Sequence, residues 1–416
     1  MSGAPARTPV TRPRERGPRA WPFYAPETAT KVAQLVGDGS VLSIGQHPAV
    51  AAFEERFARR HGSAQRALFC GSGSSALLAA YFGLDLDPGA EVLVPTNTYP
   101  TTVTPLLLLN LRPVLCDCDP LTGNISLDDA ARRVTSKTQA IAVTHLWGHP
   151  VDMDEVSPLA SRHGLAVVED CSHAHGATCR NEPVGTRATV AAFSVGSRKL
   201  VSGGMGGVLL TADESVYARA LVLGHHPDRA RDHAGAALGR YVDAGFGLNL
   251  RGTAIAAVLA ADHLERLDAT IDIKNRNLEL LARALEQHAP WLTPPRRRPW
   301  FTSGTWYGFR CAVDLPPDHA PAALQLLRDS DVAMSTRSVL LHRQRLFSDP
   351  SPLRTHVPQP PALCDPDDYP MADAAVGRSV AIETLQLYEP AEELIEGWAI
   401  AFQRVTEALG RSSPDG

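Results

Sequence analysis

The chain is expected to be an α/β protein whose largely parallel β-sheet is covered by helices on both faces. Between about residues 66 and 212, short apolar runs alternate with amphipathic stretches. The runs are apolar along almost their whole length, which is typical of strands that are buried on both faces. Strands that alternate with helices in this way predict a parallel sheet.

The predicted elements follow from this alternation. The runs that predict strands are 67–70, 91–95, 112–116, 140–144, 165–168, 190–193 and 207–211. The segments that predict helices are 76–84, 101–110, 127–133 and 153–163. The last two runs, 190–193 and 207–211, are expected to be late strands of the same sheet.

The sequence after the sheet has a different pattern. Gly224–Gly247 is rich in Gly, His, Asp and Arg and has weak periodicity, so we predict a long mobile loop. Apolar residues between Ile255 and Leu285 recur at roughly helical spacing, which predicts one long amphipathic helix leaving the first domain. After the Pro-rich break at 294–299, the remainder is expected to be a smaller α+β domain. We place the large domain at 21–265 and the small C-terminal domain at 266–416.

Composition excludes several classes of function. The 416 residues are 44% hydrophobic with a formal net charge of −5, so a deep core is possible and the basic field of a nucleic-acid binder is missing. No stretch is long and apolar enough to span a membrane. Cys116 and Cys118 have a poor spacing for zinc and are interpreted as small apolar residues in a reducing compartment. We expect a cytoplasmic protein with no metal site and no nucleic-acid or membrane partner.

Residues 1–20 hold a basic cluster among prolines and glycines. The segment lacks the apolar core and the cleavage pattern of a signal peptide, so we predict a disordered tail. Its clustered arginines are Arg7, Arg12, Arg14, Arg16 and Arg19.

The chain contains four lysines, and their settings differ. Lys31, Lys137 and Lys274 have polar or amphipathic surroundings and are expected to be solvated. Lys199 instead follows a predicted buried strand and precedes the glycine-rich run Gly203–Gly207. Small neighbours let a planar ligand approach the backbone, and partial burial would lower the pKa of the amine and make it a Schiff-base nucleophile. The alternative is a surface lysine in a glycine-rich turn.

Two further segments place candidate binding residues at the ends of predicted strands. Asp170 follows the run 165–168, and the carboxyl ends of parallel strands are where open α/β sheets bind ligands. A carboxylate there could keep the pyridine nitrogen of pyridoxal phosphate protonated; the alternative is a simple helix N-cap. Cys70–Leu77 opens a helix after a strand, and its backbone N–H groups and serine hydroxyls could cradle a phosphate. The segment is neither a P-loop nor a dinucleotide fingerprint.

Together these segments resemble the DegT/DnrJ/StrS-type sugar aminotransferases, a family of fold-type I pyridoxal-phosphate enzymes. The resemblance runs from about Val41 to Leu285 and weakens beyond. It implies an aspartate-aminotransferase-like large domain with a mostly parallel sheet flanked by helices, plus the smaller C-terminal α+β domain. The segments that carry it are Gly45–Pro48 with Phe53 and Glu54, Ser72–Leu77, Val94–Tyr99, His145–Asp154, Glu169–Gly176 and Phe193–Lys199.

The resemblance implies roles for individual residues. Lys199 matches the lysine that forms the Schiff base with pyridoxal 5'-phosphate, and Asp170 matches the acid that pairs with the ring nitrogen. His173 stands where the family usually has Gln, near the ring hydroxyl. Tyr99 matches an aromatic residue that stacks on the ring, although a tyrosine at a strand end is often part of the core. The residues that match phosphate contacts are Ser74, Ser75 and Ser194, together with Asn249, which would reach the phosphate of the neighbouring subunit in a homodimer with shared active sites.

Other polar residues have a structural interpretation beside a functional one. Arg198 and Arg251 could hold a donor carboxylate or form salt bridges. Histidines in the resembling turns and in the loop could line a site, but structural or exposed roles are more common; these are His145, His149, His225, His226 and His342. The sequence departs from the family at Met205, where an acidic residue is common, and after Arg251, where Glu and Gln are common.

The resemblance implies a transaminase that moves an amino group from glutamate or glutamine to a ketone of a sugar or cyclitol. A role in aminosugar or antibiotic biosynthesis is expected by association with an arginine-rich, lysine-poor composition. The alternatives are a pyridoxal-phosphate enzyme of another type, such as a dehydratase, an elimination catalyst or an oxidase, and a non-catalytic sensor. Dehydratases of this family have His at the lysine position, so Lys199 favours transamination.

Overall fold

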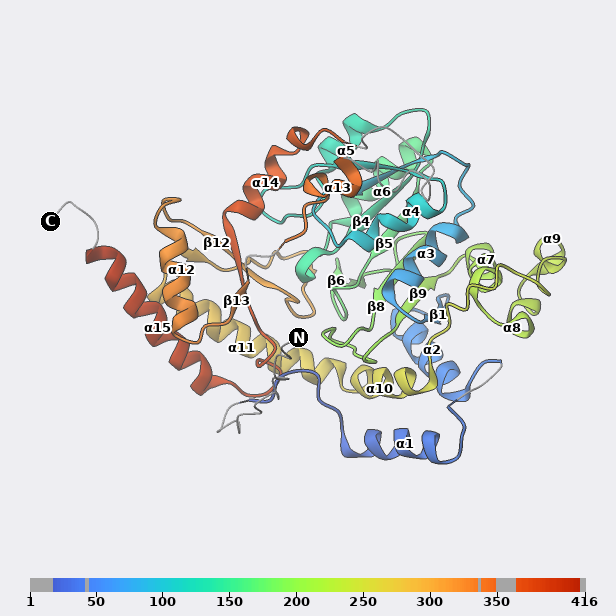
Figure 1. The fold of residues 1–416 in the computed structure, drawn as a ribbon, viewed down its shortest axis with the longest axis horizontal. Coiled ribbons are helices and arrows are strands. Elements are labelled where there is room, and N and C mark those ends of the chain that lie inside the picture. Colours follow the sequence, from blue (N-terminus) through green and yellow to red (C-terminus); the bar gives the residue numbers. More distant parts are fainter. Residues whose placement is uncertain (1–17, 42–44, 336–337, 349–363, 412–416) are drawn as a thin grey trace, which may run out of the picture.

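The computed structural model describes residues 18–41, 45–335, 338–348 and 364–411 (Figure 1). Most of the predicted basic tail lies outside these residues. At its described end, the Arg19 side chain donates from Nε to Glu389 Oε1 at 3.0 Å, so this part of the predicted tail is bound to the C-terminal half of the chain. No helix in the described ranges combines the length and apolar composition that a membrane span requires.

A seven-stranded sheet forms the centre of the larger part, as the sequence predicts. Its order is β1-β9-β8-β5-β4-β2-β3. The strands are β1 (Arg66–Cys70), β2 (Glu91–Pro95), β3 (Arg112–Cys116), β4 (Thr138–Thr144), β5 (Ala166–Asp170), β8 (Val190–Ser194) and β9 (Gly207–Thr211). Strands β3, β2, β4, β5 and β8 are parallel, and β9 runs antiparallel to both of its neighbours. All the predicted strands are therefore confirmed, with small shifts at their ends.

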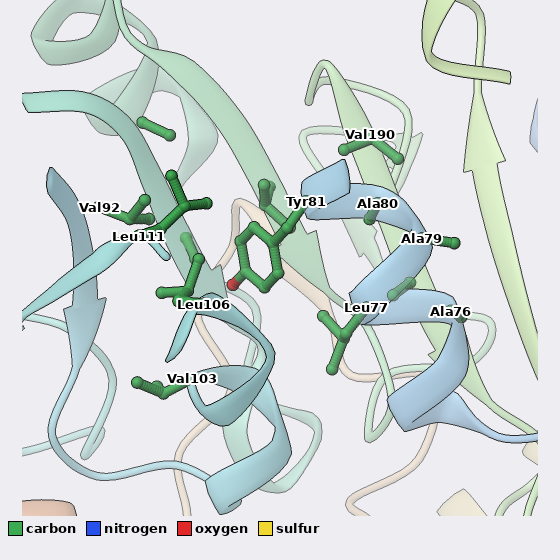
Figure 2. Packing of buried hydrophobic residues seen from close by; sticks show 14 of the residues in the cluster. Ala76, Leu77, Ala79, Ala80, Tyr81, Val92, Val103, Leu106, Leu111 and Val190 are labelled. Carbon is green, nitrogen blue, oxygen red and sulfur yellow. The ribbon is translucent and has the colours of Figure 1, made fainter. Parts of the chain in front are cut away.

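Helices cover both faces of this sheet. Successive strand residues point to opposite sides, so each strand presents apolar side chains on both faces for helices to bury. In β1, Leu68 packs in one buried cluster and Phe69 in another. Figure 2 shows α3, with Tyr81 and Leu77 packed near Leu106 of α4. The covering helices are α2 (Pro48–His61), α3 (Gly73–Gly83), α4 (Thr104–Leu108), α5 (Leu127–Arg133), α6 (Met153–His163) and α7 (Glu214–Gly224), whereas α1 (Pro26–Gly37) lies farther out, against α10 (Ala254–Glu265). The predicted helix 101–110 is in two pieces, a 3-10 turn at Pro100–Thr102 and α4.

The C-terminal part has its own antiparallel sheet and apolar core. The sheet order is β10-β12-β14-β13, with β10 (Leu292–Thr293), β12 (Phe309–Val313), β13 (Met334–Ser335) and β14 (Ser379–Ile382). Helices α12 (Ala320–Asp329) and α15 (Glu392–Arg411) pack in this core. By contrast, Phe347 of α13 (Arg345–Ser348) and Ala372 of α14 (Pro370–Gly377) join the buried cluster of the large sheet. A small sheet joins the two parts of the chain, with β11 (Phe301–Thr302) beside β6 (Thr178–Cys179), which pairs with β7 (Glu182–Pro183). The division at residue 265 stays a prediction.

Two sequence predictions about this region are wrong. The segment predicted as one long loop, Gly224–Gly247, contains two short helices, α8 (Pro227–Arg231) and α9 (Gly235–Gly239). The predicted single long helix is broken at Arg266 into α10 (Ala254–Glu265) and α11 (Leu267–His288). The break has a packing reason, since α10 lies against α2 and α1 whereas α11 lies along α15 (Figure 1).

The prediction that Lys274 is solvated is also wrong. This α11 lysine is 1% exposed, and its Nζ donates a 2.8 Å hydrogen bond to the Tyr388 hydroxyl. The same Nζ lies 3.9 Å from the centroid of the Tyr388 ring. Burial lowers the pKa of Lys274 to about 7, and the more distant Glu383 opposes this only in part. Amphipathic spacing could not reveal this burial, because the side chain is covered by residues far away in sequence.

We predict that Lys274→Met stabilises the protein by roughly 1–4 kcal/mol near neutral pH, since it removes a buried cation. The unfolded lysine holds its proton up to about pH 10.5, whereas the folded one loses it near pH 7. The unfolded state therefore binds more protons in this window, so the wild type gains stability as the pH rises. Thermal midpoints of both proteins should converge between pH 7 and 10.5; a constant difference would contradict the burial.

Candidate active site

Asp170 ends strand β5 at the carboxyl edge of the sheet. The residue is 4% exposed, and its Oδ2 accepts a 2.7 Å hydrogen bond from Thr102 Oγ1. Thr102 in turn bonds to Thr98, which follows β2. The Oδ1 atom accepts from the backbone N–H of Ser172 at 3.1 Å. Asp170 is thus the last strand residue rather than a helix N-cap, and hydroxyl groups from the loop after β2, one strand beyond its neighbour β4, fix its orientation.

Lys199 lies on the loop that connects β8 to β9. The backbone N–H of Val195 donates to Gly206 and that of Gly203 donates to Val195, so the two ends of the loop are fastened together. The indole of Trp21 donates to the Lys199 carbonyl at 2.7 Å. Burial lowers the pKa of the Lys199 amine to about 8, and the negative charge of Asp170 opposes this shift. The lysine is therefore half-buried with an adjacent carboxylate, and the interpretation as an ordinary surface lysine is wrong.

Three aromatic rings stack on one another beside Lys199. Lys199 Nζ lies 4.1 Å from the centroid of the Tyr307 ring. Tyr307 stacks on His173 with centroids 4.1 Å apart, and His173 stacks on Trp147 at 5.6 Å. Burial lowers the pKa of His173, and the nearby Lys199 charge acts in the same direction. Tyr307 is not predicted from the sequence, because it lies in the C-terminal part, where the family resemblance is weak.

The N-terminus of α3 forms a tight cradle of small residues. Ser72 caps the helix by accepting from the Ser75 backbone N–H at 3.0 Å, and the two hydroxyls are 2.8 Å apart. A Cβ added to Gly73 would lie 2.9 Å from Ser194 Cβ, so Ser194 touches the first turn of the helix. A Cβ added to Gly207 would lie 2.3 Å from the Ser72 carbonyl oxygen. The half-buried Ser74 belongs to the same turn.

The predicted residues are therefore partly brought together. Strand order places Asp170, Lys199 and Ser194 at one edge, since β5 and β8 are neighbours and β8 leads into the lysine loop. Tyr99 is 62% exposed at the end of the β2 loop, so it is not a core residue. Asn249 is exposed, and its Oδ1 accepts from Arg251 Nε at 2.7 Å.

Several secondary candidates have structural partners. Arg198 forms an ion pair with Glu383 at 2.7 Å. His145 is fully buried, and its Nε2 lies 2.8 Å from Glu169 Oε2. His342 is also fully buried, and its Nδ1 lies 2.7 Å from Thr96 Oγ1. The two histidines support the loops after β4 and β2.

The donor set fits the cofactor that the family resemblance implies. A phosphate needs N–H and hydroxyl donors at a helix start, and α3 supplies both. A pyridinium nitrogen needs a carboxylate partner, and Asp170 is a buried carboxylate at the end of β5. An aldehyde needs an amine that loses its proton near neutral pH, which Lys199 supplies.

We predict that Asp170→Asn lowers the pKa of Lys199 below about 8, because the carboxylate charge raises it in the wild type. The pKa is read from the pH dependence of acylation of Lys199 in cofactor-free protein, followed by peptide mass spectrometry. The exposed Lys137 serves as an internal control in the same digests. An unchanged or raised pKa at Lys199 would show that the two groups do not interact.

Comparisons with known proteins agree with this geometry. The model of the DegT/DnrJ/EryC1/StrS aminotransferase family matches residues 24–364. L-glutamine:2-deoxy-scyllo-inosose aminotransferase from Streptomyces lividus is 30% identical over 404 residues, which cover 92% of this chain and 93% of that protein. GDP-perosamine synthase from Escherichia coli O157:H7 is 31% identical over 286 residues, covering 65% and 76% of the two chains.

The fold comparison gives the same result. The X-ray structure of the aminotransferase from Psychrobacter cryohalolentis superposes with a TM-score of 0.81 at 25% identity, covering 94% of this chain and 100% of that one. The predicted aminotransferase-like α/β architecture is confirmed. The chain belongs to the DegT/DnrJ/EryC1/StrS aminotransferase family.

Proposed function

We propose that the chain uses pyridoxal 5'-phosphate to move an amino group from glutamine or glutamate to a ketone of a sugar or cyclitol. Its relatives include aminotransferases for a cyclitol ketone and a synthase of a nucleotide-linked aminosugar. The observation that carries the proposal is the half-buried Lys199, whose Nζ lies 4.1 Å from the centroid of the Tyr307 ring at the sheet edge that also holds Asp170. Burial lowers the pKa of this amine to about 8, and the charge of Asp170 opposes the shift. An aminosugar or antibiotic pathway in the cytoplasm is the setting that we propose.

Each residue around Lys199 has an assigned task in this proposal. When bound, the cofactor accepts electrons from the bond broken at the donor's α-carbon. Lys199 would hold it covalently through Nζ, and Asp170 would keep its ring nitrogen protonated. His173 would bond to the ring hydroxyl, and Tyr99 would cover the ring. The phosphate contacts would be Ser74, Ser75 and Ser194, with Asn249 supplied by a second copy.

Proton transfer is the task of Lys199 itself. A base works best when its pKa is close to the working pH, and burial brings the pKa of Lys199 into that range. Its Nζ would accept the proton from the donor's α-carbon and deliver it to the C4′ carbon of the cofactor in the same half-reaction. The Tyr307 ring over Nζ excludes water from one side of the amine, which limits loss of that proton to solvent.

We expect Lys199→Ala to lose at least about a hundredfold of its turnover, as general acid–base catalysis alone contributes at least that much. Lys137→Ala, a change at an exposed lysine, is the matched control and should keep wild-type turnover. Consumption of glutamine and glutamate is measured with panels of keto-sugars and keto-cyclitols. Normal turnover by Lys199→Ala would refute the assignment, and cofactor binding without consumption of any donor would favour a sensor.

The proposal includes a homodimer in which Asn249 reaches the neighbouring site. Exposed apolar side chains cluster in sequence before Asn249: Phe246 is 62% exposed and Leu248 is 50% exposed. Such surface is costly in water and is often covered by a partner. Asn249 itself lies in the left-handed region at φ 50°, so its backbone is held in a conformation that few residue types accept.

A hybrid dimer tests the shared site. We predict that Lys199→Ala and Asn249→Asp are each weakly active, the second because its carboxylate would repel the phosphate. Subunit exchange should restore up to about a quarter of the wild-type activity, since one of two sites in each hybrid is intact. No recovery after proven exchange would mean that Asn249 acts in its own subunit, whereas full activity of Asn249→Asp alone would mean that Asn249 takes no part.

A further inference from the structure

The turn after β4 holds its backbone in a conformation that few residue types accept. Trp147 lies in the left-handed region at φ 59° and ψ 11°. Gly148 follows at φ 87°, where a Cβ would lie 2.7 Å from the Thr305 carbonyl oxygen and 3.2 Å from the His173 carbonyl oxygen. A bulky residue in the left-handed region costs free energy, so contacts on both sides must hold this turn in place.

The contacts that hold Trp147 come from two different parts of the chain. Its carbonyl accepts a 3.3 Å hydrogen bond from the Gly308 N–H, and a Cβ added to Gly308 would lie 2.5 Å from Trp147 Cε3. On the other side, the Trp147 backbone N–H donates to Nδ1 of His173 at 3.3 Å. The strained turn therefore directs a backbone donor at one nitrogen of the histidine ring.

This hydrogen bond determines which nitrogen of His173 carries the proton. A backbone N–H can only donate, so Nδ1 must offer its lone pair. A neutral ring then holds its one proton on Nε2. Burial lowers the pKa of His173, and Lys199 and His175 act in the same direction, so the ring is neutral near neutral pH.

Stacking fixes the plane of the same ring. His173 lies between two aromatic side chains, with its centroid 4.1 Å from Tyr307 at an interplanar angle of 10° and 5.6 Å from Trp147 at 21°. The Tyr307 ring also lies beside Lys199 Nζ, so the fixed histidine belongs to the candidate active site. Its Nε2–H therefore keeps one direction in the site.

We propose that the Trp147 turn fixes His173 as a hydrogen-bond donor through Nε2, and that this donor stabilises the negative charge on the cofactor's ring oxygen. The inference rests on the proposed function, since it needs pyridoxal phosphate in the site. His173 touches the cofactor, and Trp147 is a positioning residue. A glutamine at position 173 would keep both hydrogen bonds, because its amide oxygen accepts and its amide nitrogen donates.

The first test reads the tautomer of His173 in the cofactor-free, full-length protein. Protein labelled with ¹⁵N-histidine is examined by NMR near neutral pH, and His173 is identified among the 15 histidines by the signals that His173→Gln lacks. We expect a proton on Nε2 and none on Nδ1. A proton on Nδ1, or on both nitrogens, would overturn the proposal.

The second test follows the colour of the cofactor-loaded protein as the pH is raised. In the yellow form, the nitrogen of Lys199 keeps a proton that it shares with the ring oxygen, and a donor to that oxygen weakens the hold on this proton. His173→Leu should therefore stay yellow to a pH at least about one unit higher, as expected for one lost hydrogen bond to a charged atom.

Two variants control this measurement. His173→Gln keeps a donor and should lose its colour at the same pH as the wild type. His163→Leu changes an exposed histidine of α6 and should also match the wild type. An equal pH of colour loss in the wild type and His173→Leu would overturn the proposal.

A third variant tests the positioning role of the turn. Gly148→Ala must displace the turn, because its Cβ has no room beside the Thr305 carbonyl, so we expect a proton on Nδ1 in part of the molecules. Gly164→Ala is the matched control, since Gly164 also has a positive φ, at 64°, but lies in open space. A folded Gly148→Ala with the wild-type tautomer would contradict the role of Trp147.

These measurements separate the inference from the proposed function. The tautomer is read without cofactor, and the colour is read without turnover. A protein that binds the cofactor but moves no amino group would refute the proposed transamination and leave the donor role of His173 standing. A proton on Nδ1 would refute the donor role and leave the transamination standing.

Discussion

The site depends on two opposite charges at one edge of the sheet, the buried Asp170 carboxylate and the half-buried Lys199 amine. Removing either charge from water is costly, and the attraction between the two offsets part of that cost. The hydroxyl of Thr102 and the backbone N–H of Ser172 give the carboxylate its hydrogen bonds. The order of β5 and β8 in the sheet brings the pair together, and the same order places Ser194 against the start of α3.

The buried Lys274 belongs to a series of contacts that ends at the loop carrying Lys199. Lys274 binds Tyr388, whose ring stacks on Trp21 with centroids 4.4 Å apart. Trp21 in turn donates to the Lys199 carbonyl. The N-terminal segment, α11 and the C-terminal part therefore meet under the loop that carries Lys199. These contacts explain why Trp21 is packed against the rest of the chain, although the residues before it predict a disordered tail.

The sequence predicts most of the sheet and part of the site, for a physical reason. Buried parallel strands are almost wholly apolar, so runs such as 91–95 and 207–211 identify them locally. Asp170 and Lys199 follow such runs directly, so their place at the sheet edge could be expected. Tyr307 could not be found in this way, because it reaches the lysine from a segment about a hundred residues later, which only tertiary packing decides.

The wrong predictions also concern features that packing between distant segments decides. The burial of Lys274 and the break at Arg266 are set by packing partners distant in sequence, α15 and the Tyr388 loop. The short helices α8 and α9 lie in a segment whose glycines and polar residues mask any periodicity. Arg310 and Trp147 line one cavity, yet they lie far apart in the chain and share no motif. Local patterns identify strands and strand-end residues, but they do not identify surfaces assembled from several segments.

The roles of Lys199 and Asp170 are tested by the visible absorption spectrum of the purified protein, before and after addition of glutamine or glutamate. We expect a yellow protein that loses this colour with one of the two donors, and a Lys199→Ala variant that lacks the lysine-bound form of the cofactor. A protein that stays colourless and unresponsive after pyridoxal phosphate is supplied would contradict the assignment of Lys199 and Asp170 to this chemistry.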